Sequence, residues 1–135
     1  MRKELDEELC RKYPQIFRDR HADMRTTAMC WGFDCGDGWY NIIDAVCAMI
    51  QNHERNNKLN NVVMPPVVAT QVKEKYGTLR FYYTGGDDYI DGVVAMAEYM
   101  SGVTCENCGS PGKIYEGAWV RTLCGEHAEE QGYHE

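Results

Sequence analysis

The amino-acid sequence predicts an α+β fold, in which a small antiparallel sheet is packed by two amphipathic helices and followed by a short C-terminal segment of different composition. Two stretches rich in β-branched and aromatic residues, 62–75 and 78–84, are separated only by Tyr76-Gly77, as in a β-hairpin. Apolar residues at helical spacing precede this hairpin, and a second such run follows it. Paired cysteines then mark the C-terminal segment. We expect a core at residues 1–103 and a separate unit at 104–135 packed on it.

Residues 2–13 mix both charge signs, and Leu5, Leu9 and Tyr13 recur on one side at near-helical spacing. This pattern predicts a surface helix that Pro14 ends. Residues 22–38 hold apolar side chains without a period, so we expect an irregular, partly buried connection.

The next segment, from residue 38 to about residue 56, is predicted to be the best helix of the chain. Asp37 precedes it and is a candidate N-cap. Residues at three- and four-residue intervals form an apolar stripe that we interpret as core: Trp39, Ile42, Ile43, Val46, Cys47, Met49 and Ile50. His53 and Glu54 follow near the end of the helix, where we expect both side chains to be solvated.

The predicted hairpin comes after a polar loop at 56–61, and Pro65-Pro66 restricts strand pairing to later residues. On its second strand, one face carries Leu79, Phe81 and Tyr83 and the other carries Arg80, Tyr82 and Thr84. The first strand alternates less regularly, with Val68, Val72 and Tyr76 opposed to Thr70, Lys73 and Lys75. One face is therefore expected to be buried, and the other to be aromatic and basic.

A further helix is predicted from Asp87 to about Ser101, with Asp87 as its N-cap and Gly102 as its stop. The residues expected to be buried on it are Tyr89 or Ile90, Val93, Val94, Ala97 and Met100. This helix leads directly into the paired cysteines.

Two pairs of potential metal ligands follow, Cys105 with Cys108 and Cys124 with His127. Two residues separate the members of each pair, so each pair can bind one ion from a single turn, and together they make a tetrahedral Cys3His set. Four protein ligands leave no position for a reactive water, so one structural zinc ion is expected. A disulfide, or no ligand role at all, remains the alternative.

The order of the predicted elements around these ligands is a cysteine knuckle, a hairpin with strands at 113–115 and 118–122, and a helix at 124–131. This order resembles a treble-clef zinc finger. Trp119 lies in the hairpin, where we expect its side chain to brace the finger.

Seven cysteines, with no apolar leader and no long apolar segment, favour a reducing, cytoplasmic compartment and no membrane association. Cys30 and Cys35 with His21 would make a second metal site only with a fourth ligand, and none is obvious. We interpret these two cysteines as packed thiols instead.

The net charge of −7 disfavours nonspecific binding to duplex nucleic acid, because most of that affinity comes from neutralising phosphates. In the finger, Lys113 and Arg121 are outnumbered by Glu106, Glu116, Glu126, Glu129, Glu130 and Glu135. Its helix is therefore poorly suited to a DNA groove.

Three stretches of the chain resemble a group of small proteins encoded by phages and prophages: Cys-Gly-Asp-Gly-Trp-Tyr at 35–40, Val-Lys-Glu-Lys-Tyr-Gly-Thr-Leu-Arg-Phe-Tyr-Tyr at 72–83, and the finger. The resemblance covers residues from about 13 to 130. It implies a context and no catalytic residues. Phage proteins of this size commonly bind a host machine, including defence complexes, and disable or redirect it.

The leading hypothesis is a non-enzymatic protein that binds a host protein, with Lys73, Lys75, Arg80, Tyr82 and Trp119 as candidate contacts. The alternative is a nucleic-acid-binding finger protein that uses Lys73, Lys75, Arg80 and the N-terminal arginines. A second alternative is a metal-dependent nuclease built on Asp87, Asp88 and His53, although no nucleophile and base are evident from the sequence. The oligomeric state is not indicated.

Overall fold

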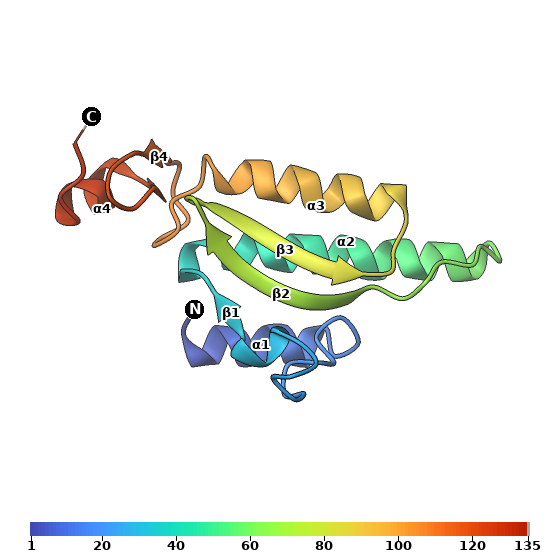
Figure 1. The fold of residues 1–135 in the computed structure, drawn as a ribbon. Coiled ribbons are helices and arrows are strands. Elements are labelled where there is room, and N and C mark those ends of the chain that lie inside the picture. The colour runs from blue at the N-terminus through green and yellow to red at the C-terminus, as the bar shows by residue number, and fades with distance from the viewer. Residues whose placement is uncertain (135) are drawn as a thin grey trace.

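The computed structural model describes residues 1–134 and confirms the α+β class (Figure 1). The helices and strands follow one another as α1 (Lys3–Lys12), β1 (Phe33–Asp34), α2 (Tyr40–Leu59), β2 (Val68–Lys75), β3 (Thr78–Thr84), α3 (Asp88–Ser101), β4 (Lys113–Tyr115), β5 (Arg121–Leu123) and α4 (Gly125–Glu130). Among the described residues, no helix is both long and apolar enough to cross a membrane.

The main sheet has the order β1-β2-β3 and is mixed, where a purely antiparallel sheet was predicted. The β2–β3 hairpin is antiparallel as expected, but β1 runs parallel to β2, with Phe33 opposite Val72. A strand of two residues is too short to show alternation, so the sequence pattern cannot reveal it.

The predicted burial of Val68 is wrong, because a bulge between Ala69 and Gln71 shifts the first strand of the hairpin. Ala69 and Val72 are fully buried, while Val68 is only partly covered. An extra residue in one strand of an antiparallel pair reverses the alternation beyond it. This explains why the first strand alternates less regularly in the sequence than the second.

The core lies between the sheet and its helices, and Figure 1 shows α2 and α3 running side by side along the hairpin. Trp39, Ile43, Ile50, Leu79 and Ile90 are completely buried there. Two residues of the predicted stripes, Met49 and Met100, are instead 44% exposed. They lie at the margins of their helical faces, where a period of 3.6 residues assigns burial poorly.

Helix α2 begins at Tyr40 and ends at Leu59, so it starts later and continues further than predicted. The predicted N-cap role of Asp37 is also wrong, because its Oδ1 accepts a hydrogen bond of 2.8 Å from the backbone N–H of Arg2. Asp37 instead opens a short 3-10 turn that precedes the helix.

The free edge of β3 is covered by helix α3. The backbone N–H of Leu79 donates to Ser101 Oγ at 2.8 Å, and the N–H of Phe81 donates to a Glu98 carboxylate oxygen at 2.9 Å. Asp87 caps this helix as predicted, accepting from the N–H of Ile90. Because these backbone N–H groups of the edge strand are already hydrogen-bonded, they are not available for pairing with a strand of another chain.

Candidate metal centre

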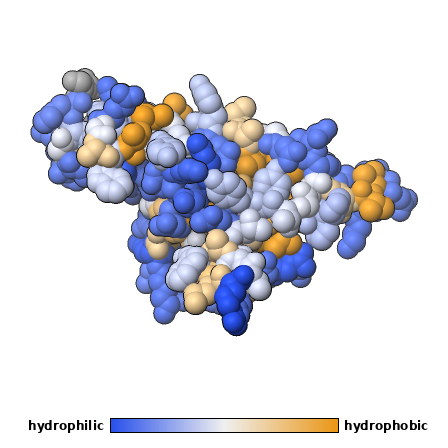
Figure 2. All heavy atoms as spheres, viewed as in Figure 1, coloured by the Kyte–Doolittle hydropathy of each residue, from blue (hydrophilic) through white to orange (hydrophobic). Residues whose placement is uncertain are grey.

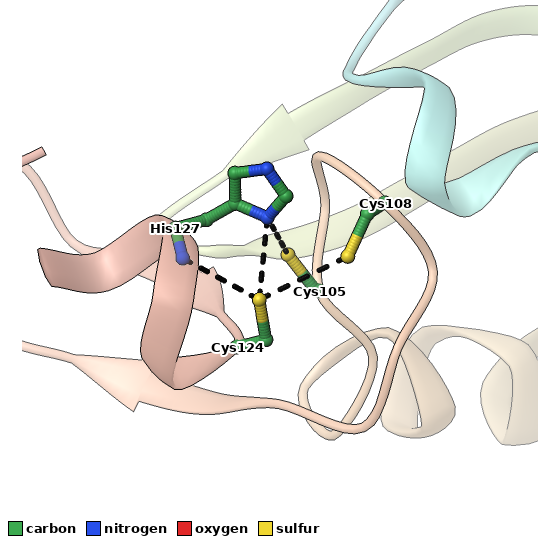
Figure 3. Close-up of side chains that lie close together, drawn as sticks. All are labelled: Cys105, Cys108, Cys124 and His127. Atoms are coloured by element: carbon green, nitrogen blue, oxygen red, sulfur yellow. Dashed lines mark hydrogen bonds between the residues drawn. The ribbon is translucent and has the colours of Figure 1, made fainter. Parts of the chain in front are cut away.

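Cys105, Cys108, Cys124 and His127 lie together in the finger, and their ligand atoms are all within 4.8 Å of one another. In Figure 3 the side chains of all four point toward a common centre. All seven cysteines are free thiols, and the Sγ atoms of Cys108 and Cys124 are 3.8 Å apart, so the disulfide alternative is not realised here. The cluster can hold a metal ion.

The distances within the cluster suit a tetrahedral ion. With metal–sulfur bonds of about 2.3 Å, two thiolates of a tetrahedral site are about 3.8 Å apart. The Cys108–Cys124 separation is 3.8 Å, and Nδ1 of His127 lies 3.2 Å from Cys124 Sγ and 3.6 Å from Cys105 Sγ. Nδ1 is therefore the imidazole ligand atom, while Nε2 faces the Glu130 carboxylate at 4.0 Å.

The local fold brings each ligand into place. Cys105 and Cys108 flank a tight turn in which the N–H of Gly109 donates to the carbonyl of Cys105 at 2.9 Å. Gly109 has φ +80°, a conformation that other residues rarely adopt. Cys124 is the N-cap of α4, and its Sγ accepts from the His127 N–H, which places both ligands at the start of one helix.

Hydrogen bonds to Cys108 favour the thiolate form that a metal ligand requires. Ser110, through its hydroxyl and its backbone N–H, lowers the pKa of the Cys108 thiol to about 6.

The finger is docked on the core through the Cys-Gly-Asp-Gly-Trp-Tyr motif, whose structural role the sequence did not reveal. The N–H of Gly38 donates to the carbonyl of Glu106 at 2.7 Å, and a Cβ placed on Gly38 would lie 2.1 Å from the carbonyl oxygen of Cys105. The buried Trp39 donates its indole N–H to the carbonyl of Thr104 at 2.9 Å. Only glycine lets the knuckle backbone approach this closely.

Glu106, between the two knuckle cysteines, is a second residue whose role the sequence did not show. The residue is 5% exposed, and its carboxylate accepts from the backbone N–H of Gly36 at 2.9 Å and from Arg121 Nε at 3.2 Å. Burial raises the pKa of Glu106, which these two donors partly oppose. The carboxylate therefore connects the knuckle to the core and to β5.

Four of the five predicted partner contacts lie on the open face of the main sheet. Lys73 is directly opposite Arg80, and Tyr82 is opposite Gln71, so their side chains share one face. Lys73, Lys75 and Tyr82 line a hollow of about 660 Å³. Within residues 1–134, none of the three cations forms an ion pair. Whether these residues bind a partner stays a prediction.

Trp119 is elsewhere, and its expected bracing role is wrong. Its side chain is 77% exposed, and residues 118–120 are not part of a strand, because β5 begins only at Arg121. The finger core consists instead of Tyr115, Leu123 and Ala128 with Cys105. The carbonyl of Trp119 accepts from the Tyr133 hydroxyl at 2.6 Å, so its backbone is fixed while its ring faces solvent.

The residues of the nuclease hypothesis meet only in part. His53 Nε2 lies 2.8 Å from Asp87 Oδ2, and its ring stacks on Tyr89 at 4.2 Å, so His53 is not the solvated side chain that we expected. In residues 1–134, however, only one group of three or more His, Cys, Asp or Glu side chains is close enough to hold a metal ion, and it is the Cys/His cluster of the finger. Among the described residues, His21, Cys30 and Cys35 form no such group, and Cys30 Sγ is 3.3 Å from the carbonyl oxygen of Thr27.

The chain matches no protein-family model, no curated protein and no solved structure. A functional assignment therefore has to come from the residues of the metal centre and of the surface.

Proposed function

We propose that this chain is a non-enzymatic, zinc-stabilised accessory protein of phage or prophage origin that binds a host protein complex, such as a defence system, and modulates or inhibits it. The phage context comes from the resemblance of residues 35–40, 72–83 and the finger described above. Three thiolates and one imidazole are the donor set typical of structural zinc, and they fill all four positions of a tetrahedral ion. Zinc at this site would hold the finger and supply no reactive water.

The main support for a binding function is the uncharged outer surface of α3. The exposed residues between Gly92 and Val103 bear no charge, although 26% of the chain is charged; they are Gly92, Ala95, Met96, Tyr99, Met100 and Val103. Met96 is 62% exposed and Tyr99 is 74% exposed. We call these six residues the α3 surface.

The α3 surface continues onto the finger. Ile114 of β4 is 47% exposed, and its Cδ1 would lie 3.6 Å from a Cβ placed on Gly102. Figure 2 shows apolar atoms gathered where α3 meets the finger. Such continuity enlarges the patch beyond scattered exposed side chains, which are normal on any protein.

A protein partner fits this surface better than a nucleic acid does. The centres of protein interfaces are depleted in charged residues and enriched in aromatic residues and Met, whose flexible side chain adapts to a facing surface. Nucleic acid needs cations to neutralise its phosphates, and the α3 surface has none.

The proposal is tested by affinity capture from nuclease-treated host lysate, comparing the wild-type chain with Tyr99→Glu and Val63→Glu. Val63 is 97% exposed in the α2–β2 loop, so its variant is a matched control for adding a charge to an exposed apolar site. We expect one host complex at near-equal stoichiometry with the wild type and Val63→Glu, and its loss with Tyr99→Glu. The purified complex should also lose activity when the wild-type chain is added. Equal capture by all three proteins, or capture without an effect on activity, contradicts the proposal.

A nucleic-acid-binding function is the second candidate, favoured by Lys73, Lys75 and Arg80 on one open face of the sheet. If those three cations neutralise three phosphates of a single strand, log Kd should change with log salt by a slope of about 2. Fluorescence anisotropy with single-stranded RNA at several salt concentrations measures this slope. Binding that Lys73→Gln does not weaken, or no binding at low salt, excludes this face.

A further inference from the structure

A groove of about 960 Å³ is lined by the tip of the β2–β3 hairpin on one side and by the finger on the other. Two aromatic side chains line it from opposite elements: Tyr76 of the hairpin turn, which is 75% exposed, and Trp119 of the β4–β5 connection, which is 77% exposed. Exposed aromatic rings from two units that meet at one groove are typical of binding anchors. We call this the hairpin–finger groove.

The two walls of the groove are held together by direct contacts. The Thr122 hydroxyl, which is buried, donates to the carbonyl of Gly77 at 2.6 Å. A Cβ placed on Gly77 would lie 3.0 Å from Cγ1 of Val120, so the turn touches the finger. The groove is therefore already formed in the free protein, which lowers the cost of ordering it for a ligand.

Tyr76 occupies a position that its backbone disfavours. Its φ is +53° and that of Gly77 is +85°, as in the type I′ turn of a two-residue hairpin. Asn, Asp and Gly are preferred at the first position of such a turn, whereas a bulky residue there is strained. The requirements of the fold alone thus do not account for tyrosine at this tip.

The groove is lined by more carboxylates than cations. Asp34, Glu74 and Glu106 line it, together with Arg121 and Met1. Lys75 Nζ lies 5.8 Å from the centroid of the Tyr76 ring, so an arginine would have to compete with this lysine for that ring. Arg121 is already paired with Glu106 at 3.2 Å, and the α-amino group of Met1 donates to the carbonyls of Phe33 and Cys35. Glu74 uses one carboxylate oxygen to accept from the Gly77 N–H at 2.7 Å. The chain as a whole has a net charge of −7.

We propose that the hairpin–finger groove binds an arginine side chain on an extended segment of a partner protein, with the guanidinium against the rings of Tyr76 and Trp119 and paired with Glu74 or Asp34. A guanidinium stacks on aromatic rings and donates to carboxylates in the same plane, and this groove offers both groups. This inference takes from the proposed function only the assumption that the partner is a protein. It uses no residue of the α3 surface.

The test uses the full chain in its metal-loaded form and two short synthetic peptides. One is acetyl-Gly-Arg-Gly-Arg-Gly-amide, and the other has citrulline in place of both arginines, which keeps the shape and removes the charge. Binding is followed by the NMR signal of the Trp119 indole N–H and by calorimetry. We expect saturable binding of the arginine peptide and an affinity for the citrulline peptide at least about tenfold lower. Equal affinity for both peptides, or no saturable binding of the arginine peptide, overturns the proposal.

Three variants distinguish an effect on peptide binding in the groove from an effect on the stability of the fold. Tyr76→Asn removes the ring but keeps a residue that the turn prefers, so it should weaken arginine-peptide binding by about three- to fivefold without lowering the melting temperature. Trp119→Ala should weaken binding at least as much. Trp31→Ala is the matched control, because Trp31 is 68% exposed and lines a different hollow beside α1. Unchanged affinity in both Tyr76→Asn and Trp119→Ala, or an equal loss in Trp31→Ala, overturns the assignment.

The peptide test and the lysate test can fail separately. The peptide test needs no host protein, and Tyr99→Glu should leave peptide binding unchanged because Tyr99 is not among the residues that line the groove. If a host complex is captured through the α3 surface but the arginine peptide does not bind, the groove proposal is overturned and the proposed function still stands.

Discussion

The core and the finger of this protein differ in how many apolar side chains they bury. The core buries a continuous cluster of apolar side chains contributed by α1, the sheet, α2 and α3. Among the described residues of the finger, the buried apolar side chains are only those of Cys105, Tyr115, Leu123 and Ala128, and one of these four belongs to the candidate metal centre. A unit with so small a core cannot offset its conformational entropy by burial alone. An ion bound at the candidate metal centre would supply to the finger the stability that packing supplies to the core.

The core and the finger are nevertheless joined by close backbone contacts and hydrogen bonds that fix the position of the finger. Gly36 and Gly38 admit the knuckle backbone, Trp39 donates to Thr104, and Glu106 accepts from Gly36. The docked finger then forms one wall of the hairpin–finger groove. Loss of the metal should therefore remove a binding surface that lies partly on the core.

Metal removal should have the largest effect, and it should be confined to the finger. Structural zinc contributes on the order of 10 kcal/mol to the folding of small units. In Cys105→Ser treated with chelator, we expect the NMR signals of residues 104–134 to collapse to random-coil positions while those of α2 and the main sheet persist. Cys30→Ser is the control, since Cys30 lies outside the cluster. An unchanged melting curve after prolonged chelation would show that burial suffices for the finger.

Trp39→Ala should destabilise the core as well as the contact between the core and the finger. Trp39 is fully buried in the core and also donates to Thr104, so its removal leaves a cavity and an unpaired carbonyl. We expect a loss of about 3–5 kcal/mol in the free energy of unfolding, measured by urea titration. Trp31→Ala, at an exposed position, should cost much less. A loss limited to the finger signals would mean that Trp39 serves docking more than the core.

Gly38→Ala tests the interface between the two regions. A Cβ at this position would meet the carbonyl oxygens of Cys105 and Glu106 at 2.1 and 2.6 Å, so the knuckle would have to move. We expect a loss of about 1–3 kcal/mol and a weaker affinity for zinc, measured by competition with a chromophoric chelator. Gly92→Ala is the control, since nothing lies within 4 Å of its added methyl group. Equal zinc affinities in these two variants would argue against coupling between docking and metal binding.

Asp87→Asn should have a smaller effect, limited to the core and dependent on pH. The hydrogen bond from His53 holds the pKa of Asp87 below its ordinary value. A lowered pKa in the folded state contributes stability that is complete above the unfolded-state pKa of about 4 and is lost as the pH falls through the folded-state pKa. The wild type should thus lose more stability than the variant on acidification below about pH 4, in melting curves recorded at several pH values. If wild type and variant lose equal stability on acidification, the hydrogen bond between His53 and Asp87 does not contribute to the pH dependence.

Trp119→Ala should have the smallest effect on stability, below about 0.5 kcal/mol, because its ring is mostly exposed. Thermal melting of the metal-loaded variant measures it. A large loss would restore the bracing role expected from the sequence and would place Trp119 in the finger core after all.

Elements whose signal is local could be predicted from the amino-acid sequence. Helical spacing identified α1, α2 and α3, alternation identified β3, and the two-residue gaps between Cys105 and Cys108 and between Cys124 and His127 indicated a shared ion. In each case the residues that define the feature lie within a few turns or one tight loop of each other. The prediction of the α+β class was correct for this reason.

Features that depend on residues distant in the sequence became visible only in the folded chain. The parallel pairing of β1, the bulge that buries Ala69, and the approach of the knuckle to Gly38 have no periodic or spacing signal. The same holds for the groove, whose walls at Tyr76 and Trp119 come from separate units. Local patterns record which face of an element is buried, but they do not record which distant element covers it.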